Sequence, residues 1–271
     1  MADIWASGAA YEPYVGRWSR LVAREFLTWL DIRPGAVWLD IGCGTGALSE
    51  TILTTAAPEA VKGIDASPDF VEYARVYVND HRVTFQAGNA QSLPFEDRTF
   101  DAVVSGLVLN FLPQPALALS AMARATRPGG MVAAYVWDYA GQMQLMRYFW
   151  DAAVALDADA RDLDEGRRFP LCHPDRLADL FRGAGLADVQ VRPIDMLTRF
   201  RDFDDYWSPF LGGQSPAPCY AMSCPEDRRV TLRESIRAAL PIGHDGSISL
   251  TARAWAVRGS VGNNPMGPTI S

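Results

Sequence analysis

The chain has little of what marks several large classes of protein. Its 271 residues carry a formal net charge of -7, so no excess of basic residues offers a surface for a polyanion, and nucleic acid is a poor candidate partner. No stretch approaches the roughly 18 consecutive apolar residues that a membrane-spanning helix needs. Residues 1–10 lack a basic region followed by an apolar run, so nothing predicts secretion. We therefore expect a cytoplasmic protein without a membrane span.

Cysteine is scarce as well. The 4 cysteines, at positions 43, 172, 219 and 224, show neither the C-x-x-C spacing of a metal site nor the density of a disulfide framework. We expect reduced thiols and no metal site.

A glycine-rich turn after a buried strand is the chain's most informative feature. Residues 37–41 (VWLDI) read as a strand, and Gly42, Gly44 and Gly46 follow at alternate positions before a helix that begins near residue 47. Glycine lets the backbone bend sharply and approach a ligand, and the helix start directs free N–H groups at that ligand. The pattern predicts a cofactor loop. Residues 42–47 also fit the dinucleotide pattern G-x-G-x-x-A, but Asp40 would repel a pyrophosphate and favours a cationic cofactor.

The motif LDIGCGTG at residues 39–46 resembles the glycine motif of the class I S-adenosylmethionine-dependent methyltransferases. The resemblance is to their small-molecule branch, the type 11 methyltransferases with the ubiquinone/menaquinone-type enzymes. It covers residues 11–137 with specific motifs and the rest only in general layout. It implies an α/β, Rossmann-like, doubly wound fold, with a seven-stranded, mostly parallel sheet, an antiparallel last strand and helical lid insertions. The implied activity is methyl transfer from S-adenosyl-L-methionine to a small molecule.

The resemblance and the predicted strand ends nominate the cofactor-binding residues. Asp65 ends a predicted strand about 20 residues past the glycines, where nucleotide-binding folds place a carboxylate on the two ribose hydroxyls. Family members usually have an acid where Asn89 stands, which accepts from the adenine amino group, so this chain departs from the pattern there. The N-terminal segment commonly folds over the cofactor in the family, although Tyr14 could simply pack and Arg17 be solvated. The expected set is Tyr14, Arg17, Asp40, Gly42, Cys43, Gly44, Asp65, Ala66, Asn89, Ala90, Gln91, Ser105 and Gly106.

Residues 139–211 form the candidate lid over the methyl acceptor, because they add helices rich in tryptophan, phenylalanine and methionine. We expect an apolar or aromatic acceptor, while the alternative that these side chains form an ordinary core stays open. No general base is identifiable. The candidate is His173, which borders this segment but could be only a neighbour of a helix cap. The expected acceptor contacts are Asn110, Phe111, Trp137, Trp150 and Trp207.

We expect one domain with four parts. Residues 1–35 would be a cofactor-covering segment and helix, 36–138 the cofactor-binding core, 139–258 the lid helices and completing strands, and 259–271 a tail. Three alternatives remain: a non-catalytic protein that binds S-adenosylmethionine or its product, an NAD-dependent oxidoreductase, and a relative that uses the sulfonium for other chemistry. The sequence does not specify the acceptor, the methylated atom or the oligomeric state.

Overall fold

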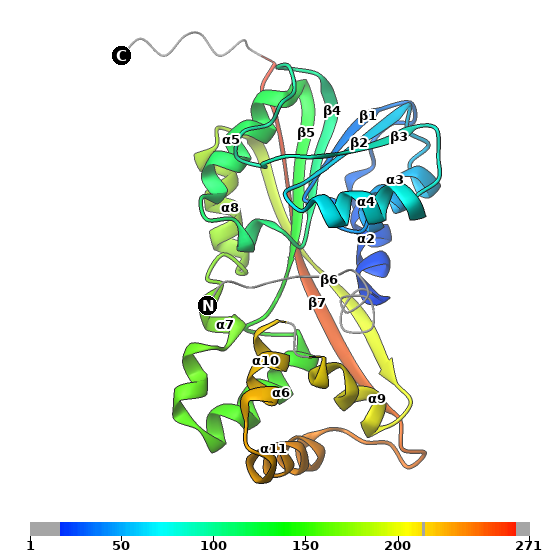
Figure 1. Cartoon of the computed structure of the whole chain (residues 1–271). Coiled ribbons are helices and arrows are strands. Elements are labelled where there is room, and N and C mark those ends of the chain that lie inside the picture. Colours follow the sequence, from blue (N-terminus) through cyan, green and yellow to red (C-terminus); the bar gives the residue numbers. More distant parts are fainter. Residues whose placement is uncertain (1–16, 213–214, 264–271) are drawn as a thin grey trace. The chain divides into compact units, whose positions relative to one another are not determined.

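A computed structural model describes residues 17–212 and 215–263 of the chain (Figure 1). A 7-stranded sheet of order β3-β2-β1-β4-β5-β7-β6 forms its centre, with helices around it. The predicted fold class is confirmed. The strands are β1 (Val37–Ile41), β2 (Ala60–Asp65), β3 (Val83–Ala87), β4 (Phe100–Gly106), β5 (Thr126–Trp137), β6 (Ala187–Phe200) and β7 (Ile248–Ser260).

The first five strands are parallel. β1 pairs with β2 and β4, β2 with β3, and β4 with β5. The apolar side chains of β1 are buried on both faces, as expected for a parallel strand covered by helices. Ile41 lies opposite Ile64, so the carboxyl ends of β1 and β2 meet at one edge of the sheet.

The last strand runs antiparallel to its neighbours. The Val261 N–H donates to the Gly130 carbonyl at 2.9 Å, and the Asp138 N–H donates to the Arg253 carbonyl at 2.9 Å. Residue numbers therefore fall along β7 as they rise along β5, which is the antiparallel pattern.

The helices begin and end close to where the sequence predicts. α4 has Ser67 as its N-cap, whose hydroxyl accepts from the Phe70 N–H at 3.4 Å, and Pro68 in its first turn. α8 begins at Pro174, as expected. The helices and 3-10 turns are α2 (Arg17–Leu30), α3 (Ala47–Thr55), α4 (Pro68–Tyr77), η2 (Leu109–Phe111), α5 (Pro115–Ala125), α6 (Gln144–Leu156), η3 (Ala158–Asp162), α7 (Glu165–Arg168), α8 (Pro174–Gly183), α9 (Phe203–Trp207), η4 (Ser208–Leu211), α10 (Pro216–Ser223) and α11 (Glu226–Ala239).

The later strands are longer than the sequence predicts. Residues 127–130 (RPGG) follow the end of α5 and form the start of β5. A register shift between Phe100 and Ala102 leaves room there for Pro128 and for the positive φ of Gly129. β6 continues past Pro193 to Phe200, since an edge strand tolerates a proline without an N–H. β7 extends to Ser260, two residues into the expected tail.

The chain divides into two compact units. Among the described residues, unit 1 comprises residues 17–22, Trp137–His173 and Ile194–Ala254, and unit 2 comprises Ala23–Val136, Pro174–Pro193 and residues 255–263. α2, β5, β6 and β7 contribute residues to both units.

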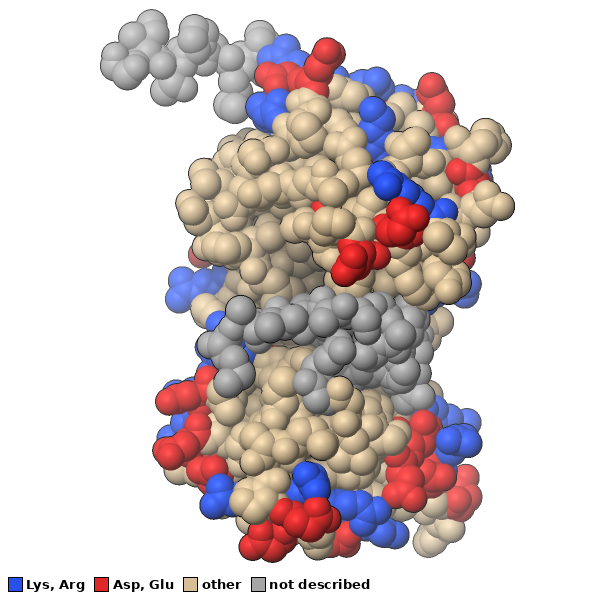
Figure 2. All heavy atoms as spheres, in the orientation of Figure 1, with Lys and Arg blue, Asp and Glu red and all other residues tan. Residues whose placement is uncertain are grey.

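Unit 1 has an aromatic core. Phe149 stacks on Phe210 with ring centroids 4.6 Å apart, and Tyr220 packs edge-on against Phe149. The buried Tyr206 hydroxyl donates to the Leu145 carbonyl at 2.9 Å. Near α11, acidic and basic side chains lie beside one another at the surface (Figure 2), which agrees with the ion pair between Arg233 and Glu234. Aromatic packing therefore holds this unit together.

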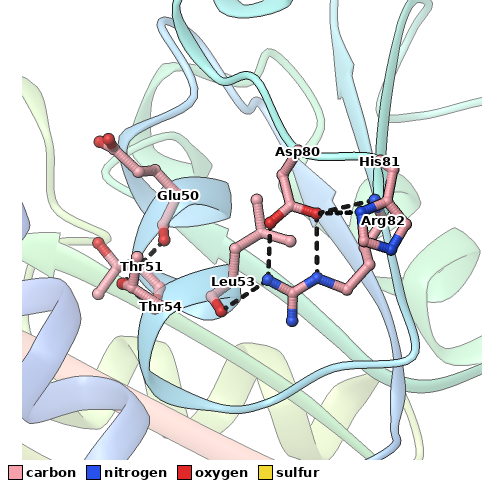
Figure 3. Close-up of polar contacts among 7 residues, drawn as sticks. All are labelled: Glu50, Thr51, Leu53, Thr54, Asp80, His81 and Arg82. Atoms are coloured by element: carbon pink, nitrogen blue, oxygen red, sulfur yellow. Dashed lines mark hydrogen bonds and ion pairs between the residues drawn. The ribbon is translucent and has the colours of Figure 1, made fainter.

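In unit 2, two arginines connect the edge strand β3 and the turn before it to the helices α3 and α4. The Arg82 guanidinium pairs with the Asp80 carboxylate, with Nη2 at 2.6 Å, and also donates to the Leu53 carbonyl of α3 at 3.3 Å (Figure 3). This arginine lowers the pKa of the Asp80 carboxyl below its usual range. The Arg75 Nη2 of α4 donates to the Phe85 carbonyl of β3 at 2.8 Å. α3 and α4 lie beside β2 and β3 in Figure 1 and cover this part of the sheet.

Across residues 17–212 and 215–263, none of the helices combines the length and the apolar character that crossing a bilayer requires.

Candidate functional site

The glycine turn after β1 is held between β2 and the segment after β4. Gly42, Gly44 and Gly46 all have positive φ, at 69°, 51° and 88°. The Gly42 N–H donates to the Ile64 carbonyl at 2.7 Å. A Cβ at Gly42 would lie 2.5 Å from the Val108 Cγ2, so a side chain there would force the turn to move. The turn therefore requires glycine for both conformation and space.

Gly44 differs from its two neighbours because it faces open space. A Cβ placed on it would meet nothing within 4 Å. Its N–H donates to the Asp65 Oδ2 at 2.9 Å. The middle glycine therefore joins the ends of β1 and β2 and leaves room for a ligand above the turn.

Asp65 is fixed by backbone donors on both of its oxygens. Oδ1 accepts from the Ser67 N–H at 2.9 Å, and Oδ2 accepts from Gly44. Burial raises the pKa of this carboxyl, and the two N–H bonds oppose that rise. Each carboxylate oxygen has a second lone pair, so the oriented group can still accept from two hydroxyl donors. This is the geometry that the sequence predicts for a ribose-binding acid.

Asp40 is a buried acid with one unsatisfied oxygen. It is 1% exposed, its Oδ2 accepts from the Ser49 hydroxyl at 2.7 Å, and its Oδ1 has no hydrogen-bond partner among the described residues. Burial raises the pKa of Asp40 to about 7. A nearby positive charge would favour the ionised form, so the site suits a cationic ligand.

The loop after β3 positions three of the expected adenine-side residues. The Asn89 Oδ1 accepts from the Gln91 N–H at 2.8 Å, and the Gln91 Oε1 accepts from the Gln114 N–H at 3.3 Å. Ala90 is half-buried between them. Because a backbone donor holds the Asn89 oxygen, the amide Nδ2 is the atom directed away from that bond, and it is a donor.

A residue with strained backbone, Leu107, follows directly after β4. The Ser105 hydroxyl donates to the Ile41 carbonyl at 2.9 Å and is completely buried, so it links β4 to β1. A Cβ at Gly106 would lie 2.5 Å from the Tyr135 hydroxyl. Leu107 follows with a φ of 62°, a left-handed conformation that is costly for a leucine. Strained backbone of this kind often accompanies functional sites.

Two expected acceptor contacts lie in η2, just after β4. The Asn110 Nδ2 is buried and has no hydrogen-bond partner among the described residues, and Phe111 is half-buried. A buried donor without a partner is costly, so this amide is suited to an acceptor atom of a ligand.

The other candidate acceptor contacts belong to unit 1. Trp137, Trp150 and Trp207 are 2%, 0% and 5% exposed, and the Trp150 Nε1–H donates to Glu165 within the aromatic core. His173 is exposed. The structure thus gives the three tryptophans a packing role in their own unit.

The remaining expected residues are placed as follows. Cys43 is buried, and burial raises the pKa of its thiol well above the ordinary value, so it is not a thiolate. Ala66 is exposed beside Asp65. Tyr14 lies outside the described residues, and so does the side chain of Arg17, whose backbone begins α2.

Three residues of this site were not foreseen from the sequence. Ser49 satisfies Asp40, Val108 closes the space above Gly42, and Leu107 takes the left-handed conformation. Ser49 is a serine in α3 that contacts the acid preceding the turn, and a polar residue on a buried helix face is the signal that could have revealed it. The other two have no signal in local sequence.

A doubly wound sheet with a glycine turn and a neighbouring strand-end acid defines the class of nucleotide-type cofactor enzymes. A family model described as "Methyltransferase domain" matches residues 39–134. The chain is 30% identical over 193 residues to demethylmenaquinone methyltransferase of Geobacillus stearothermophilus, covering 65% of this chain and 80% of that relative. The chain belongs to the class I S-adenosylmethionine-dependent methyltransferases.

Solved structures agree on the fold. The YcgJ protein of Bacillus subtilis superposes with a TM-score of 0.61 at 18% identity, covering 90% of this chain and 99% of that one. Phosphoethanolamine N-methyltransferase 2 of Haemonchus contortus, in complex with S-adenosyl-L-methionine, gives a TM-score of 0.58 at 17% identity, covering 94% of this chain and 56% of that one.

The protein is therefore an enzyme of the methyltransferase class with S-adenosylmethionine as its cofactor, and an NAD-dependent oxidoreductase finds no support. The residues at the turn fit that cofactor. It has a ribose, a sulfonium and an ammonium but no phosphate. The open space at Gly44, the acceptor capacity of Asp65 and the unsatisfied Asp40 oxygen match a ligand with hydroxyl donors and positive charge.

Proposed function

We propose that the residues around the glycine turn of unit 2 hold S-adenosylmethionine and that the enzyme methylates a small, apolar or aromatic acceptor. One observation carries the proposal. Asp65 is held by the Gly44 N–H at 2.9 Å, and no atom of the described residues lies within 4 Å of a Cβ added to Gly44.

Each group of residues has a proposed role toward the cofactor. Asp65 accepts from the ribose hydroxyls, Asp40 balances the positive charge, and the loop of Asn89, Ala90 and Gln91 lies along the adenine. The backbone at Gly42, Cys43, Gly44, Ala66, Ser105 and Gly106 forms the walls. Tyr14 and Arg17 remain candidates for the methionine end of the cofactor.

The protein's contribution to the reaction is chiefly positioning. The bound cofactor supplies a methyl group already activated on a sulfonium. Holding an acceptor in line with that methyl can supply about 7 to 11 kcal/mol of the barrier. A general base is not required for an acceptor that is already nucleophilic, so the exposed His173 is a secondary candidate.

The acceptor is proposed from chemistry and from relatives. A relative of this chain is named for demethylmenaquinone, and on that basis we propose a quinone-like acceptor. The unsatisfied Asn110 Nδ2 could donate to an acceptor oxygen. Phe111 is the proposed apolar contact in unit 2, while Trp137, Trp150 and Trp207, the other candidates from the sequence, pack within unit 1. A net charge of -7 argues against a nucleic-acid substrate. A cytoplasmic location remains part of the proposal.

Calorimetric titration with S-adenosylmethionine tests the cofactor site. We expect Asp65→Ala to weaken binding roughly 100-fold or more, because two hydrogen bonds to a charged group are lost. Asp97→Ala is the matched control, since Asp97 is an exposed acid of the same unit that pairs with Arg124. Equal affinity of Asp65→Ala and wild type would refute the proposed site.

Mass spectrometry of an acceptor panel tests the acceptor class. The panel contains demethylated quinones, phenols and polar amines, each incubated with enzyme and cofactor. We expect a mass gain of one methyl group on a quinone or phenol. Methylation of the polar amines alone would refute the apolar or aromatic acceptor.

A further inference from the structure

The strand at the end of the sheet order, β6, has an outer edge whose sequence is complementary to the same edge of another copy. In β6, the stretch Ile194–Phe200 belongs to unit 1 and alternates between the two faces. Ile194, Thr198 and Phe200 are buried. Asp195, Leu197 and Arg199 are exposed, and at 68% Leu197 is the most exposed of the large apolar side chains among the described residues. An exposed edge strand with an apolar side chain at its centre is a template for pairing with another chain.

One side of β6 is occupied and the other is not. The Arg253 guanidinium of β7 donates to both oxygens of Asp195, at 2.6 and 2.8 Å, and the Thr198 hydroxyl donates to the Leu250 carbonyl at 3.0 Å. β6 ends the sheet order, next to β7 in Figure 1, so no strand of the described chain pairs with its outer side. Within the described residues, the outward backbone N–H and C=O groups of residues 195–199 have no strand partner, so they can pair with a strand of another chain.

We propose that this edge pairs with the same edge of a second copy of the chain, antiparallel and centred on Leu197. A two-fold axis through that position places Leu197 opposite Leu197 of the second copy. It also places Asp195 opposite Arg199 of the second copy, and Arg199 opposite Asp195. Directly opposed residues of an antiparallel pair share one face, so these side chains meet in contact.

Charge favours the register centred on Leu197 over the registers centred two residues away on either side. Centring the pair on Asp195 or on Arg199 would oppose two like charges, which destabilises an antiparallel pair. In the proposed register the charges alternate across the sheet, from Arg253 through Asp195 to Arg199 of the second copy. Asp195 already has a lowered pKa because of its hydrogen bonds from Arg253, so it carries its charge at neutral pH.

The ends of the paired segment also match. Pro193 lacks an N–H and stops the ladder on one side. In the proposed register it lies opposite position 201, where β6 has already ended at Phe200. The paired segment is therefore short, and we expect a dissociation constant in the micromolar range, weaker than a standard-size interface.

Sedimentation velocity from about 1 to 200 µM protein tests the inference. Wild type is expected to pass from monomer to dimer across this range. Leu197→Lys is expected to raise the dissociation constant at least about tenfold, because it opposes two ammonium groups. Val230→Lys is the control, since Val230 is an exposed apolar residue of α11 in the same unit.

A charge-exchange experiment separates pairing from loss of folding. Arg199→Glu and Asp195→Lys each place like charges in opposition, so each variant alone should be monomeric. Mixed one to one, they should form a heterodimer, because Asp195 of one then faces Arg199 of the other and Glu faces Lys. A wild-type monomer at 200 µM, equal behaviour of Leu197→Lys and Val230→Lys, or folded variants that do not associate on mixing would each overturn the inference.

Discussion

The side-chain amide of Asn89 has a nitrogen at the position where an aspartate would have a second oxygen. Its oxygen accepts from the Gln91 N–H at 2.8 Å, which leaves the amide nitrogen as the outward group. The nitrogen is a donor, whereas the adenine amino group requires an acceptor. In the proposed site, the asparagine can accept from that amino group only through the second lone pair of its oxygen, whereas an aspartate would also offer a second oxygen.

Asn89→Asp should accordingly tighten cofactor binding. The new carboxylate would keep the bond from Gln91 and offer its second oxygen to the adenine amino group. One added hydrogen bond is worth about 1 kcal/mol, or roughly fivefold in affinity. Calorimetry with S-adenosylmethionine measures the change, and Asn79→Asp in an exposed loop is the control for added charge. Weaker binding to Asn89→Asp would show that the amide donates to the adenine ring.

Gly44 allows a test that separates folding from binding. Gly44 and Gly35 both have positive φ and open space around an added Cβ. Alanine at either position should cost about 1 kcal/mol of unfolding free energy, from the left-handed backbone alone. Gly44→Ala should also abolish cofactor binding, because its methyl group would enter the space above the turn, while Gly35→Ala should bind normally. Thermal melts and calorimetry measure the two effects, and full binding by Gly44→Ala would place the cofactor elsewhere.

The sequence anticipates residues whose role follows from spacing. Gly44 and Asp65 are predictable because a turn between a strand and a helix, and an acid about 20 residues later, are local patterns. Val108 is not, because its role arises from a contact across the fold with Gly42, and Ser49 could be found only as a polar residue on a buried helix face.

Among the elements, α7 contributes a buried acid to unit 1. Glu165 is 2% exposed, accepts from the Trp150 Nε1–H, and has a pKa raised to about 7 by burial. Its unfolded value is about 4.3. Between these two values the folded state holds a proton that the unfolded state has lost, so the unfolding free energy falls as pH rises through this window.

Glu165→Gln removes this titration. The amide oxygen can still accept from Trp150, and no charge is buried above pH 7. The variant should therefore match wild type near pH 4.5 and exceed it by about 3 kcal/mol at pH 8. Urea unfolding at the two pH values measures the difference, with the exposed Glu226→Gln as control. A difference independent of pH would mean that Glu165 does not titrate in this range.

Element lengths were harder to predict than element types. The alternation of strands and helices up to Trp137 is visible in the sequence, and the observed elements follow it. Residues 187–193 read as a strand in the sequence, but β6 continues through Pro193 to Phe200, because a strand at the sheet edge tolerates a proline. α10 begins at Pro216, within the Gly/Pro-rich residues 212–218. Prolines in the first turn of a helix are easily mistaken for a loop in the sequence.

For the whole molecule, cofactor binding should protect unit 2. A ligand at 100 times its dissociation constant stabilises the folded state by about 2.7 kcal/mol. Hydrogen exchange measured with saturating S-adenosylmethionine should slow around residues 37–67, where the Gly44 and Ser67 N–H groups hold Asp65. The Asp65→Ala variant under the same conditions is the control. Unchanged exchange in this stretch of the wild type would contradict the proposed site.

The order of strands in the sheet limits how the gene can be shortened. β5 is followed in the sheet by β7, which the chain supplies only at Ile248–Ser260. A fragment ending at Trp137 would keep every residue of the glycine motif but leave the long apolar β5 as a bare edge, prone to aggregate. Expression trials that seek the cofactor-binding part alone should therefore retain the chain through Val261, whose backbone bonds to Gly129 and Gly130 close that edge.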